Sequence, residues 1–368
     1  MQFSYFMPTK VLFGQECITK NQGEFSRFGK RALLITGRNS AKVSGALADV
    51  CSALEKQGIA WEVFDQIGEN PTFAMVEAGG AAARKFGPDM LVAIGGGSPL
   101  DASKAVAVLA VNNIPAVKLY DGNFAARPLP ILAVPITAGT GSEVTPYSIL
   151  TDSERQTKRS FSGPDLFPRV AFLDARYTQS LSHKVTVDTA IDALSHCIEG
   201  YLSRRSTPAS DALALEGIGC FGTAISALTS DAATDLSGRE KLLYVSLLGG
   251  MVIAQTGTTV VHALGYSLTY FKDVPHGRAN GLLLGEYLSF TETVAAEKIK
   301  CLLAKMQMAT VADFKKFMRG LFPEKVELTD REMEDFALLA SKTANIGFTP
   351  RQPNHEDLKQ LLRSSLSR

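Results

Sequence analysis

The first half of the chain alternates short β-rich runs with helical ones, and this alternation most restricts its fold. Strand-like runs lie at 31–37 (RALLITG), 60–67 (AWEVFDQI), 89–94 (DMLVAI) and 129–136 (LPILAVPI), with helical patterns between them. Strands and helices that alternate in this way are typical of βαβ units with a parallel sheet. The runs LLIT and LVAI are nearly all apolar, as expected of strands covered on both faces. We therefore predict a Rossmann-like α/β fold for this half.

The second half has a different pattern. A polar hairpin is expected at 148–161 and one more strand at 170–174, and after about Tyr177 the strand signals fade. Helical periodicity then dominates, in the segments 188–203, 208–229, 239–254 and 331–344. We predict an α/β domain over 1–178 and an all-helical domain over 179–368, within the two to three domains that this length allows.

Charge and cysteine content exclude several classes of protein. The chain has 38 Lys and Arg against 37 Asp and Glu, so its charge suggests neither a nucleic-acid partner nor an anionic membrane surface. Its five cysteines form no CxxC pair, which favours free thiols in a reducing compartment. The N-terminal residues MQFSYFMPTK do not resemble a signal peptide. A cytoplasmic location is the expectation.

One long segment lacks charge. No Asp, Glu, Lys or Arg occurs from Leu242 to Phe271, and a bilayer span needs about 20 apolar residues. The run also contains several glycines, threonines and His262, so we interpret it as helix buried inside a soluble protein and expect no membrane partner.

Two glycine-containing loops follow predicted strands. GGGS (95–98) stands between a strand and a helix, where glycine lets the backbone approach a ligand and the helix N-terminus attracts phosphate. Ser98 and Asp101 could bond sugar or phosphate oxygens. The second loop, PITAGTGSEVT (135–145), offers hydroxyls at Thr137, Thr140 and Thr145, among others. Neither loop is a P-loop or a GxGxxG motif, but two such loops at strand ends fit one dinucleotide across a switch point of the sheet.

A candidate metal site lies in the second half. Asp192 and His196 are four residues apart, so on a helix they share a face. His262 follows the uncharged run, and His276 lies between Pro275 and Gly277, in a loop or at a helix start. Each residue alone has an ordinary structural explanation. Together, one carboxylate and three imidazoles suit Fe²⁺ or Zn²⁺.

With these motifs in place, the sequence resembles the iron-containing (group III) alcohol dehydrogenase family. The resemblance rests on GGGSPLDASK, PITAGTGSEVTPYSILTD, DALSHCIEGYLS and HALGYSLT…PHG, and it is greatest to the propanediol/butanol dehydrogenase branch. It implies the dehydroquinate synthase-like/iron-containing alcohol dehydrogenase fold, an α/β half that binds NAD(P)(H), and a helical half that binds Fe²⁺, with Zn²⁺ as an alternative. It also implies a homodimer and a small alcohol or aldehyde as substrate.

The resemblance assigns roles to particular residues. Asp192, His196, His262 and His276 match the metal ligands through which catalysis occurs. The positions that match cofactor contacts are Asn70, Gly96, Gly97, Ser98, Asp101, Thr137, Thr140, Thr145 and Lys158.

Three positions depart from the family pattern. Tyr266 replaces a second histidine linked to proton handling in many relatives, so it becomes a catalytic candidate of its own. Ile136 replaces the first threonine of a Thr-Thr pair. Gly37 replaces an aspartate that NAD-preferring relatives use to accept a hydrogen bond from the ribose 2′-OH. Because Arg38, Ser40 and other polar residues follow Gly37, the sequence favours NADP(H) over NAD(H).

The predicted function is a metal-dependent alcohol dehydrogenase, or aldehyde reductase, that acts on small primary alcohols, aldehydes or diols. Two related enzymes are alternatives: a zinc-dependent glycerol dehydrogenase-like enzyme and a dehydroquinate synthase-like enzyme. A nucleotide-binding regulatory module with a helical interaction domain is an alternative of another class, and it requires the four candidate ligands to be scattered in space.

Overall fold

The computed structural model describes residues 2–229 and 235–366, which form two compact units. The α/β unit comprises Met7–Leu181. The helical unit comprises Ser182–Arg368 together with the N-terminal segment Met1–Phe6.

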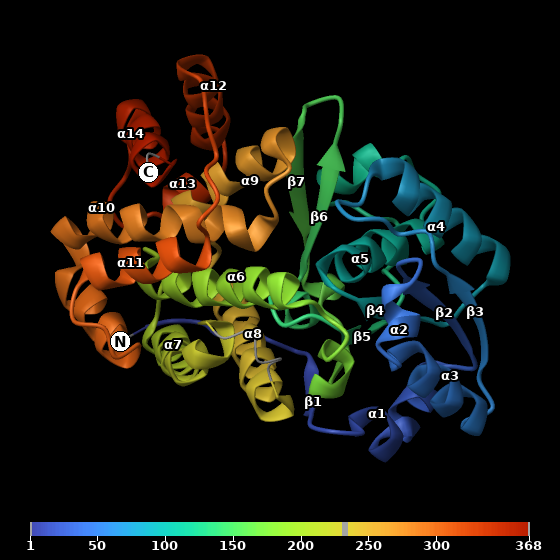
Figure 1. The fold of residues 1–368 in the computed structure, drawn as a ribbon. Helices are drawn as coiled ribbons and strands as arrows, with labels where there is room; N and C mark the ends of the chain where they lie inside the picture. The colour runs from blue at the N-terminus through green and yellow to red at the C-terminus, as the bar shows by residue number, and fades with distance from the viewer. Residues whose placement is uncertain (1, 230–234, 367–368) are drawn as a thin grey trace. The chain divides into compact units, whose positions relative to one another are not determined.

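A parallel sheet forms the centre of the α/β unit (Figure 1). Within the described residues its strand order is β1-β8-β5-β4-β2-β3, and each neighbouring pair is parallel. The strands are β1 (Lys10–Phe13), β2 (Arg31–Thr36), β3 (Ala60–Phe64), β4 (Met90–Gly95), β5 (Ile131–Pro135) and β8 (Val170–Leu173). A separate antiparallel hairpin consists of β6 (Tyr147–Asp152) and β7 (Thr157–Ser162).

Helices cover both faces of the sheet. Alternate side chains of β2 point to opposite faces, so Leu33 and Ile35 join one core cluster while Ala32 and Leu34 join the other. Helices α4 (Phe73–Phe86) and α5 (Gly97–Val111) pack on the first face, and α1 (Cys17–Lys20) and α3 (Ala46–Lys56) pack on the second. The remaining short helices are α2 (Ser40–Val43), η1 (Gln22–Phe28), η2 (Ala116–Asp121), η3 (Ser142–Val144), η4 (Pro164–Leu166) and η5 (Ala175–Thr178). The predicted α/β fold class is confirmed.

Two details of this unit differ from the sequence prediction. The helical pattern that starts at Ala41 is divided into α2 and α3, because Gly45 takes a left-handed conformation with φ of +82°. Strand β1 was not predicted, since KVLF is short and lies at the edge of the sheet.

The strand order places three candidate loops together. From β2 the chain proceeds to β3 on one side, whereas from β4 it proceeds to β5 on the other, so the order reverses between β2 and β4. Ligands of open α/β sheets bind at such a switch point, outside the carboxyl ends of the strands. The loops that begin at Gly37, Gly96 and Ile136 all leave from these ends.

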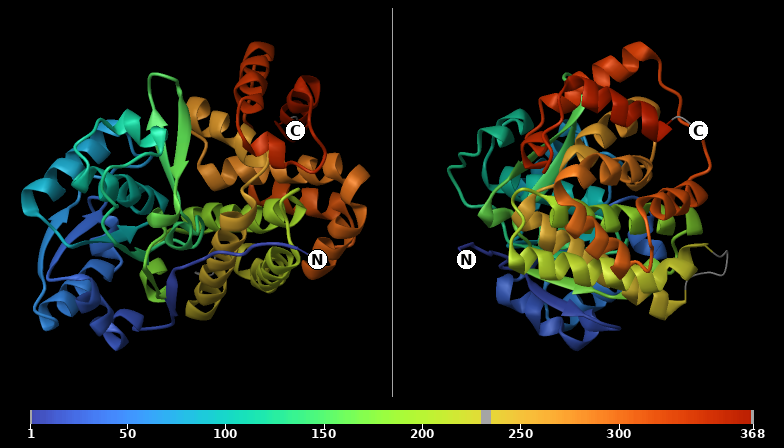
Figure 2. Two further views of the ribbon diagram at one scale, coloured as in Figure 1. Left: turned by 180° about the vertical axis from the view of Figure 1, so that it is seen from behind. Right: turned by 90° about the vertical axis from the view of Figure 1, so that its left-hand side faces the viewer.

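The described part of the helical unit is built around α6 (His183–Leu202), whose residues are nearly all buried from Ala190 onward. It packs against α7 (Pro208–Thr229), α8 (Leu236–Thr256) and α10 (His276–Lys305). The other helices are α9 (Val260–Lys272), α11 (Val311–Leu321), α12 (Asp330–Ser341), α13 (Asn345–Phe348) and α14 (His355–Leu366). The C-terminal helices α12 and α14, red in Figure 2, pack against each other.

The uncharged run is helical and mostly buried, but it is not one helix. It covers most of α8 and nearly all of α9. The helical conformation is interrupted between them at Gly257, which has φ of +66°. In the described part of the chain, no helix by itself is long and apolar enough to cross a membrane. The pair α8 and α9 meets that test only when taken together, and it is bent by 112°.

Candidate metal centre and cofactor loops

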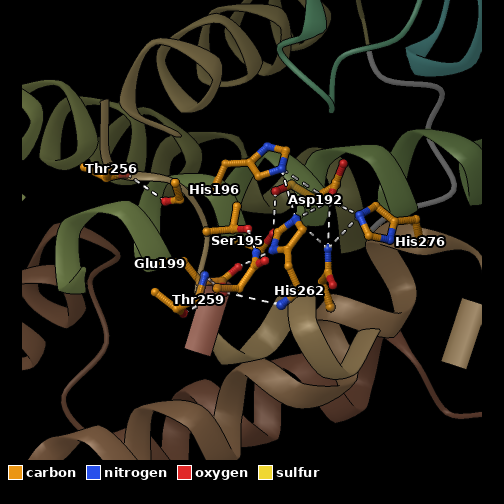
Figure 3. Close-up of polar contacts among 12 residues, drawn as sticks. Asp192, Ser195, His196, Glu199, Thr256, Thr259, His262 and His276 are labelled. Atoms are coloured by element: carbon orange, nitrogen blue, oxygen red, sulfur yellow. Dashed lines mark hydrogen bonds and ion pairs between the residues drawn. The ribbon is translucent and has the colours of Figure 1, made fainter. Parts of the chain in front are cut away.

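Three predicted ligands converge in the interior of the helical unit (Figure 3). Asp192 and His196 face the same way from neighbouring turns of α6, and His262 reaches them from α9. Their ligand atoms all lie within 4.8 Å of one another. The Nε2 atoms of the two histidines are 3.1 Å apart, and they lie 3.9 Å (His196) and 3.8 Å (His262) from Oδ1 of Asp192.

His276 joins this cluster from the first position of α10. Its Nε2 lies 3.9 Å from Oδ1 of Asp192, and its ring centroid is 5.1 Å from that of His262. The approach depends on Gly277, where a Cβ atom would overlap the carbonyl oxygen of Asp188 on α6. Pro275 precedes the helix, so His262 and His276 come from separate helices, as their flanking residues suggested.

A buried glutamate, Glu199, pairs with Nδ1 of His262, the ring nitrogen that does not face the other ligands. Its Oε1 accepts hydrogen bonds from the backbone N–H and the hydroxyl of Thr259, at 2.7 and 2.6 Å, and Oε2 pairs with Nδ1 of His262. Burial alone would lower the pKa of His262, but the Glu199 carboxylate outweighs it and raises this pKa above its ordinary value. Burial likewise would raise the pKa of Glu199, yet the charge of His262 and the donors around it bring it below its ordinary value.

A buried amide, Asn280, also contacts the cluster. Its Nδ2 is 3.0 Å from Oδ1 of Asp192, 3.1 Å from Nε2 of His262 and 3.4 Å from Nε2 of His276. The sequence prediction included neither Glu199 nor Asn280. A signal existed for both, since Glu199 is the acid three residues after His196 and Asn280 follows His276 by one helical turn.

The donor set fits a divalent metal. With Nδ1 of His262 directed at a carboxylate, its Nε2 keeps a lone pair for a ligand bond, an arrangement common to metal-binding histidines. One carboxylate oxygen and up to three imidazole nitrogens are suitable ligands for Fe²⁺ or Zn²⁺. The regulatory-module alternative requires the four candidate ligands to be scattered in space, and their convergence does not support it.

Tyr266 lies beside the candidate ligands. It follows His262 by one turn of α9, and its ring stacks on that of His276 with centroids 5.6 Å apart and planes 9° apart. The side chain is half-buried. Tyr266 therefore contacts the cluster where many relatives are expected to have a histidine.

The two glycine loops of the α/β unit pack against each other. Gly96 precedes α5 and Gly97 begins it. A Cβ at Gly96 would lie 3.1 Å from the side chain of Thr137, and one at Gly97 would lie 2.7 Å from that of Thr140. A larger residue at Gly97 would therefore force the side chain of Thr140 to move, and one at Gly96 would press on Thr137. Ser98 follows in the first turn of α5 and is half-buried.

Asp101 and Thr145 face inward and support the second loop. The carboxylate of Asp101 accepts hydrogen bonds from the Ser142 hydroxyl at 2.5 Å and the backbone N–H of Ile149 at 3.1 Å. The ammonium of buried Lys104 donates to Ser142 at 2.7 Å and lies 3.5 Å from the hydroxyl of Thr145. From the sequence, Asp101 is expected to be available for a ligand, but in the structure both of its oxygens already have protein partners.

The other predicted cofactor positions fall into two groups. Gly37 and exposed Ser40 follow β2 at the switch point, and a Cβ at Gly37 would lie 3.3 Å from the Ile67 carbonyl oxygen. Asn70 and Lys158 both adjoin Thr151 of the hairpin: the Asn70 carbonyl accepts from the hydroxyl of Thr151 at 3.0 Å, and Thr151 is the strand partner of Lys158.

Comparison with known proteins matches both units. The family model described as iron-containing alcohol dehydrogenase matches residues 8–175, and the one described as the C-terminal part of the Fe-containing alcohol dehydrogenase family matches residues 186–366. The chain belongs to the iron-containing alcohol dehydrogenase family. It is therefore an oxidoreductase that acts on alcohols or aldehydes, and the regulatory-module hypothesis is wrong.

Individual relatives are similar to this chain over nearly its whole length. Lactaldehyde reductase from Escherichia coli K12 is 30% identical over 95% of this chain and 96% of its own length. The structure of an iron-containing alcohol dehydrogenase from Thermotoga maritima is 40% identical and covers both chains completely, with a TM-score of 0.93. Sulfoacetaldehyde reductase from Bifidobacterium kashiwanohense, solved in complex with NAD⁺, is 26% identical, covers 100% of this chain and 99% of its own, and has a TM-score of 0.89.

Proposed function

We propose that this protein is an Fe²⁺-dependent, NADP(H)-preferring dehydrogenase of small primary alcohols or diols, which also reduces the corresponding aldehydes. The main support is the buried cluster of Asp192, His196 and His262, with His276 beside it, in a chain of the iron-containing family. Zn²⁺ is the alternative metal, because the same donors suit it.

In this proposal Asp192, His196, His262 and His276 hold the metal. When bound, the ion supplies Lewis acidity for the alcohol or carbonyl oxygen of the substrate. The residues themselves fix the ligand atoms and exclude water, since the first three side chains are almost fully buried while the side chain of His276 is 26% exposed. The open side of the cluster, where a substrate oxygen would enter, is therefore that of His276.

Tyr266 is the candidate for contact with the substrate oxygen. The stacking on His276 fixes its ring, and its hydroxyl can donate or accept a hydrogen bond. The ordinary pKa of tyrosine, about 10, makes it a poor proton acceptor at neutral pH. We therefore propose that Tyr266 orients the substrate by hydrogen bonding.

The loops of the α/β unit would bind the cofactor. Backbone N–H groups of Gly97 and Ser98 at the start of α5 suit a pyrophosphate, since this helix has 15 residues and its first N–H groups lack helical partners. Thr137 and Thr140 contribute hydroxyls from the adjacent loop, and Asn70 and Lys158 offer polar groups beside the hairpin. Asp101 and Thr145 contribute by holding the second loop in place.

The preference for NADP(H) rests on the end of β2. Gly37 has no carboxylate to repel a 2′-phosphate or to accept from a 2′-hydroxyl. Exposed Arg38 and Ser40 lie next to it, and Lys42, one turn further on, pairs with Asp65 at 3.2 Å. These groups can bind an additional phosphate.

A reconstitution assay tests the proposed function. The protein is purified without oxygen, stripped of metal, supplied with Fe²⁺ or Zn²⁺, and mixed with NADPH or NADH and a short aldehyde such as lactaldehyde. We expect cofactor oxidation restored by Fe²⁺ and faster with NADPH. Restoration by Zn²⁺ alone would change the metal, faster NADH oxidation would reverse the cofactor preference, and no turnover by a folded protein with either metal would refute the function.

Two further features are also proposals. A homodimer accords with the prevalence of symmetric dimers among oligomers, and light scattering of the purified protein tests it. A reducing, cytoplasmic compartment accords with the five cysteines, all of which lie in the described part of the chain as free thiols.

A further inference from the structure

Glu199 accepts hydrogen bonds with both carboxylate oxygens in the interior of the helical unit. The residue is fully buried on α6, and its Oε1 lies 2.7 Å from the backbone nitrogen of Thr259, 2.6 Å from the Thr259 hydroxyl and 3.4 Å from the backbone nitrogen of His262. These N–H groups belong to the first turn of α9, which otherwise has no side-chain cap. Glu199 therefore caps α9 from a neighbouring helix, where the helix dipole favours a negative charge.

The same carboxylate determines which nitrogen of His262 carries the proton. Oε2 of Glu199 pairs with Nδ1 of His262, and every other partner of the carboxylate is a donor. A carboxylate surrounded by donors is satisfied when it is ionised and His262 has its proton on Nδ1. Nε2 of His262 then presents a lone pair toward Asp192 and His196.

A divalent cation would balance the charges around the cluster. An imidazole that binds a metal through its Nε2 lone pair is neutral, so with a metal bound the two carboxylates of Asp192 and Glu199 contribute two negative charges and the histidines contribute none. Nearby Asp188 is already compensated by the guanidinium of Arg278, whose Nε is 3.0 Å away. Because an uncompensated charge in a protein interior is costly, the two carboxylates together match one M²⁺ ion.

We propose that Glu199 is a positioning residue of the metal centre, which fixes His262 as a ligand and supplies the second negative charge that selects a divalent cation. Only Asp192 supplies charge directly at the ligand cluster; Glu199 supplies it through His262. This inference rests on the proposed metal site and extends it to a residue outside the ligand set.

Glu199→Gln tests the proposal, because glutamine keeps the volume and one acceptor oxygen but removes the charge. Co²⁺ is the probe, since its visible absorption reports ligand geometry, and affinity is measured by competition with a chelator over a range of pH. Loss of an outer partner of a metal ligand typically lowers metal affinity about 10- to 100-fold. We expect a loss of this size, with altered absorption bands in the complex that still forms.

Two variants separate positioning from a general effect on folding. Thr259→Val removes one donor to Glu199 and should weaken Co²⁺ binding less than Glu199→Gln does. Glu143→Gln changes another buried glutamate, in the α/β unit, and should leave Co²⁺ affinity unchanged. If Glu199→Gln does not fold, Thr259→Val decides: unchanged Co²⁺ affinity and absorption in that variant would then overturn the proposal.

The outcomes distinguish this inference from the proposed function. A wild-type protein that binds no Co²⁺ at the cluster would refute the metal site itself. A wild-type protein that binds Co²⁺, together with a Glu199→Gln variant of equal affinity, pH dependence and absorption, would refute the role of Glu199 alone.

Discussion

Replacement of Gly277 by alanine should damage the metal centre without removing any ligand. The added Cβ would overlap the carbonyl oxygen of Asp188 and would lie 2.9 Å from Cβ of Asp192. The first of these atoms is helix backbone and cannot rotate away, so the first turn of α10 must move. That turn carries His276 and is followed by Asn280, both of which contact the cluster.

The size of the effect follows from two opposing terms. Overpacking of a tightly packed interior typically costs about 1–3 kcal/mol, while alanine gains up to about 1 kcal/mol over glycine in a helix. Because the clash involves backbone, we expect a net loss of about 2 kcal/mol in the free energy of unfolding of the helical unit. For a unit of this size, that loss lowers the melting temperature by about 4–8 °C.

Gly320→Ala is the matched control. Gly320 lies on α11, and a Cβ there would meet nothing within 4 Å, so this change should be neutral or slightly stabilising. Calorimetry of the metal-free proteins measures the melting temperature, and Co²⁺ titration measures metal affinity. A Gly277→Ala protein that melts at the temperature of the control and binds Co²⁺ as tightly as the wild type would refute this prediction.

Three further predictions concern other parts of the molecule. Gly37→Asp should lower the preference for NADPH over NADH in kcat/KM by about tenfold or more, since like charges 4 Å apart repel by about 1–4 kcal/mol near a protein surface; an unchanged ratio would contradict the placement of the 2′-phosphate. Tyr266→Phe keeps the ring on His276 and should lower kcat/KM for the aldehyde without a change in Co²⁺ affinity. Tyr266→Leu should lower both kcat/KM and Co²⁺ affinity. A Tyr266→Phe variant with the kinetics of the wild type would exclude a role for the hydroxyl. Burial raises the pKa of Glu143 to about 7, above the ordinary 4.5, so its contribution to stability is complete below pH 4.5 and is lost as the pH rises through 7. Glu143→Gln should therefore be more stable than the wild type at pH 8 by roughly 3 kcal/mol, with the difference shrinking toward pH 5, as urea unfolding would show; a constant difference would disprove the titration.

Local patterns were sufficient to predict the α/β fold and to select candidate residues for the metal cluster. Apolar strands such as 91–94 can be recognised in the sequence because both faces of the sheet are covered. The spacing of Asp192 and His196 places both on one face of a helix, which the structure retains. Combining His262 and His276 with them was a hypothesis from donor chemistry that the family resemblance then supported. Their separation of fourteen residues does not by itself fix where two different helices meet.

The remaining features depend on contacts between distant segments. Glu199 looks like an ordinary helix carboxylate in sequence, and only the arrival of the α9 N-terminus gives it four donors. Asp101 was expected to face a ligand. Instead, its carboxylate accepts hydrogen bonds from Ser142 and Ile149, which lie beyond β5 in the chain. The sequence also did not predict the break between α8 and α9 at Gly257, because apolar composition predicts that a segment is buried but not where a helix ends or bends.

The most direct test of the account is the metal content of the wild type and of His276→Ala after loading with Fe²⁺ without oxygen. Elemental analysis and circular dichroism would be measured on the same samples. We predict one Fe²⁺ per wild-type chain, activity that follows metal content, and a folded His276→Ala protein that has lost most of its iron. A His276→Ala protein with full iron content and full activity would contradict the assignment of this cluster as the catalytic metal centre.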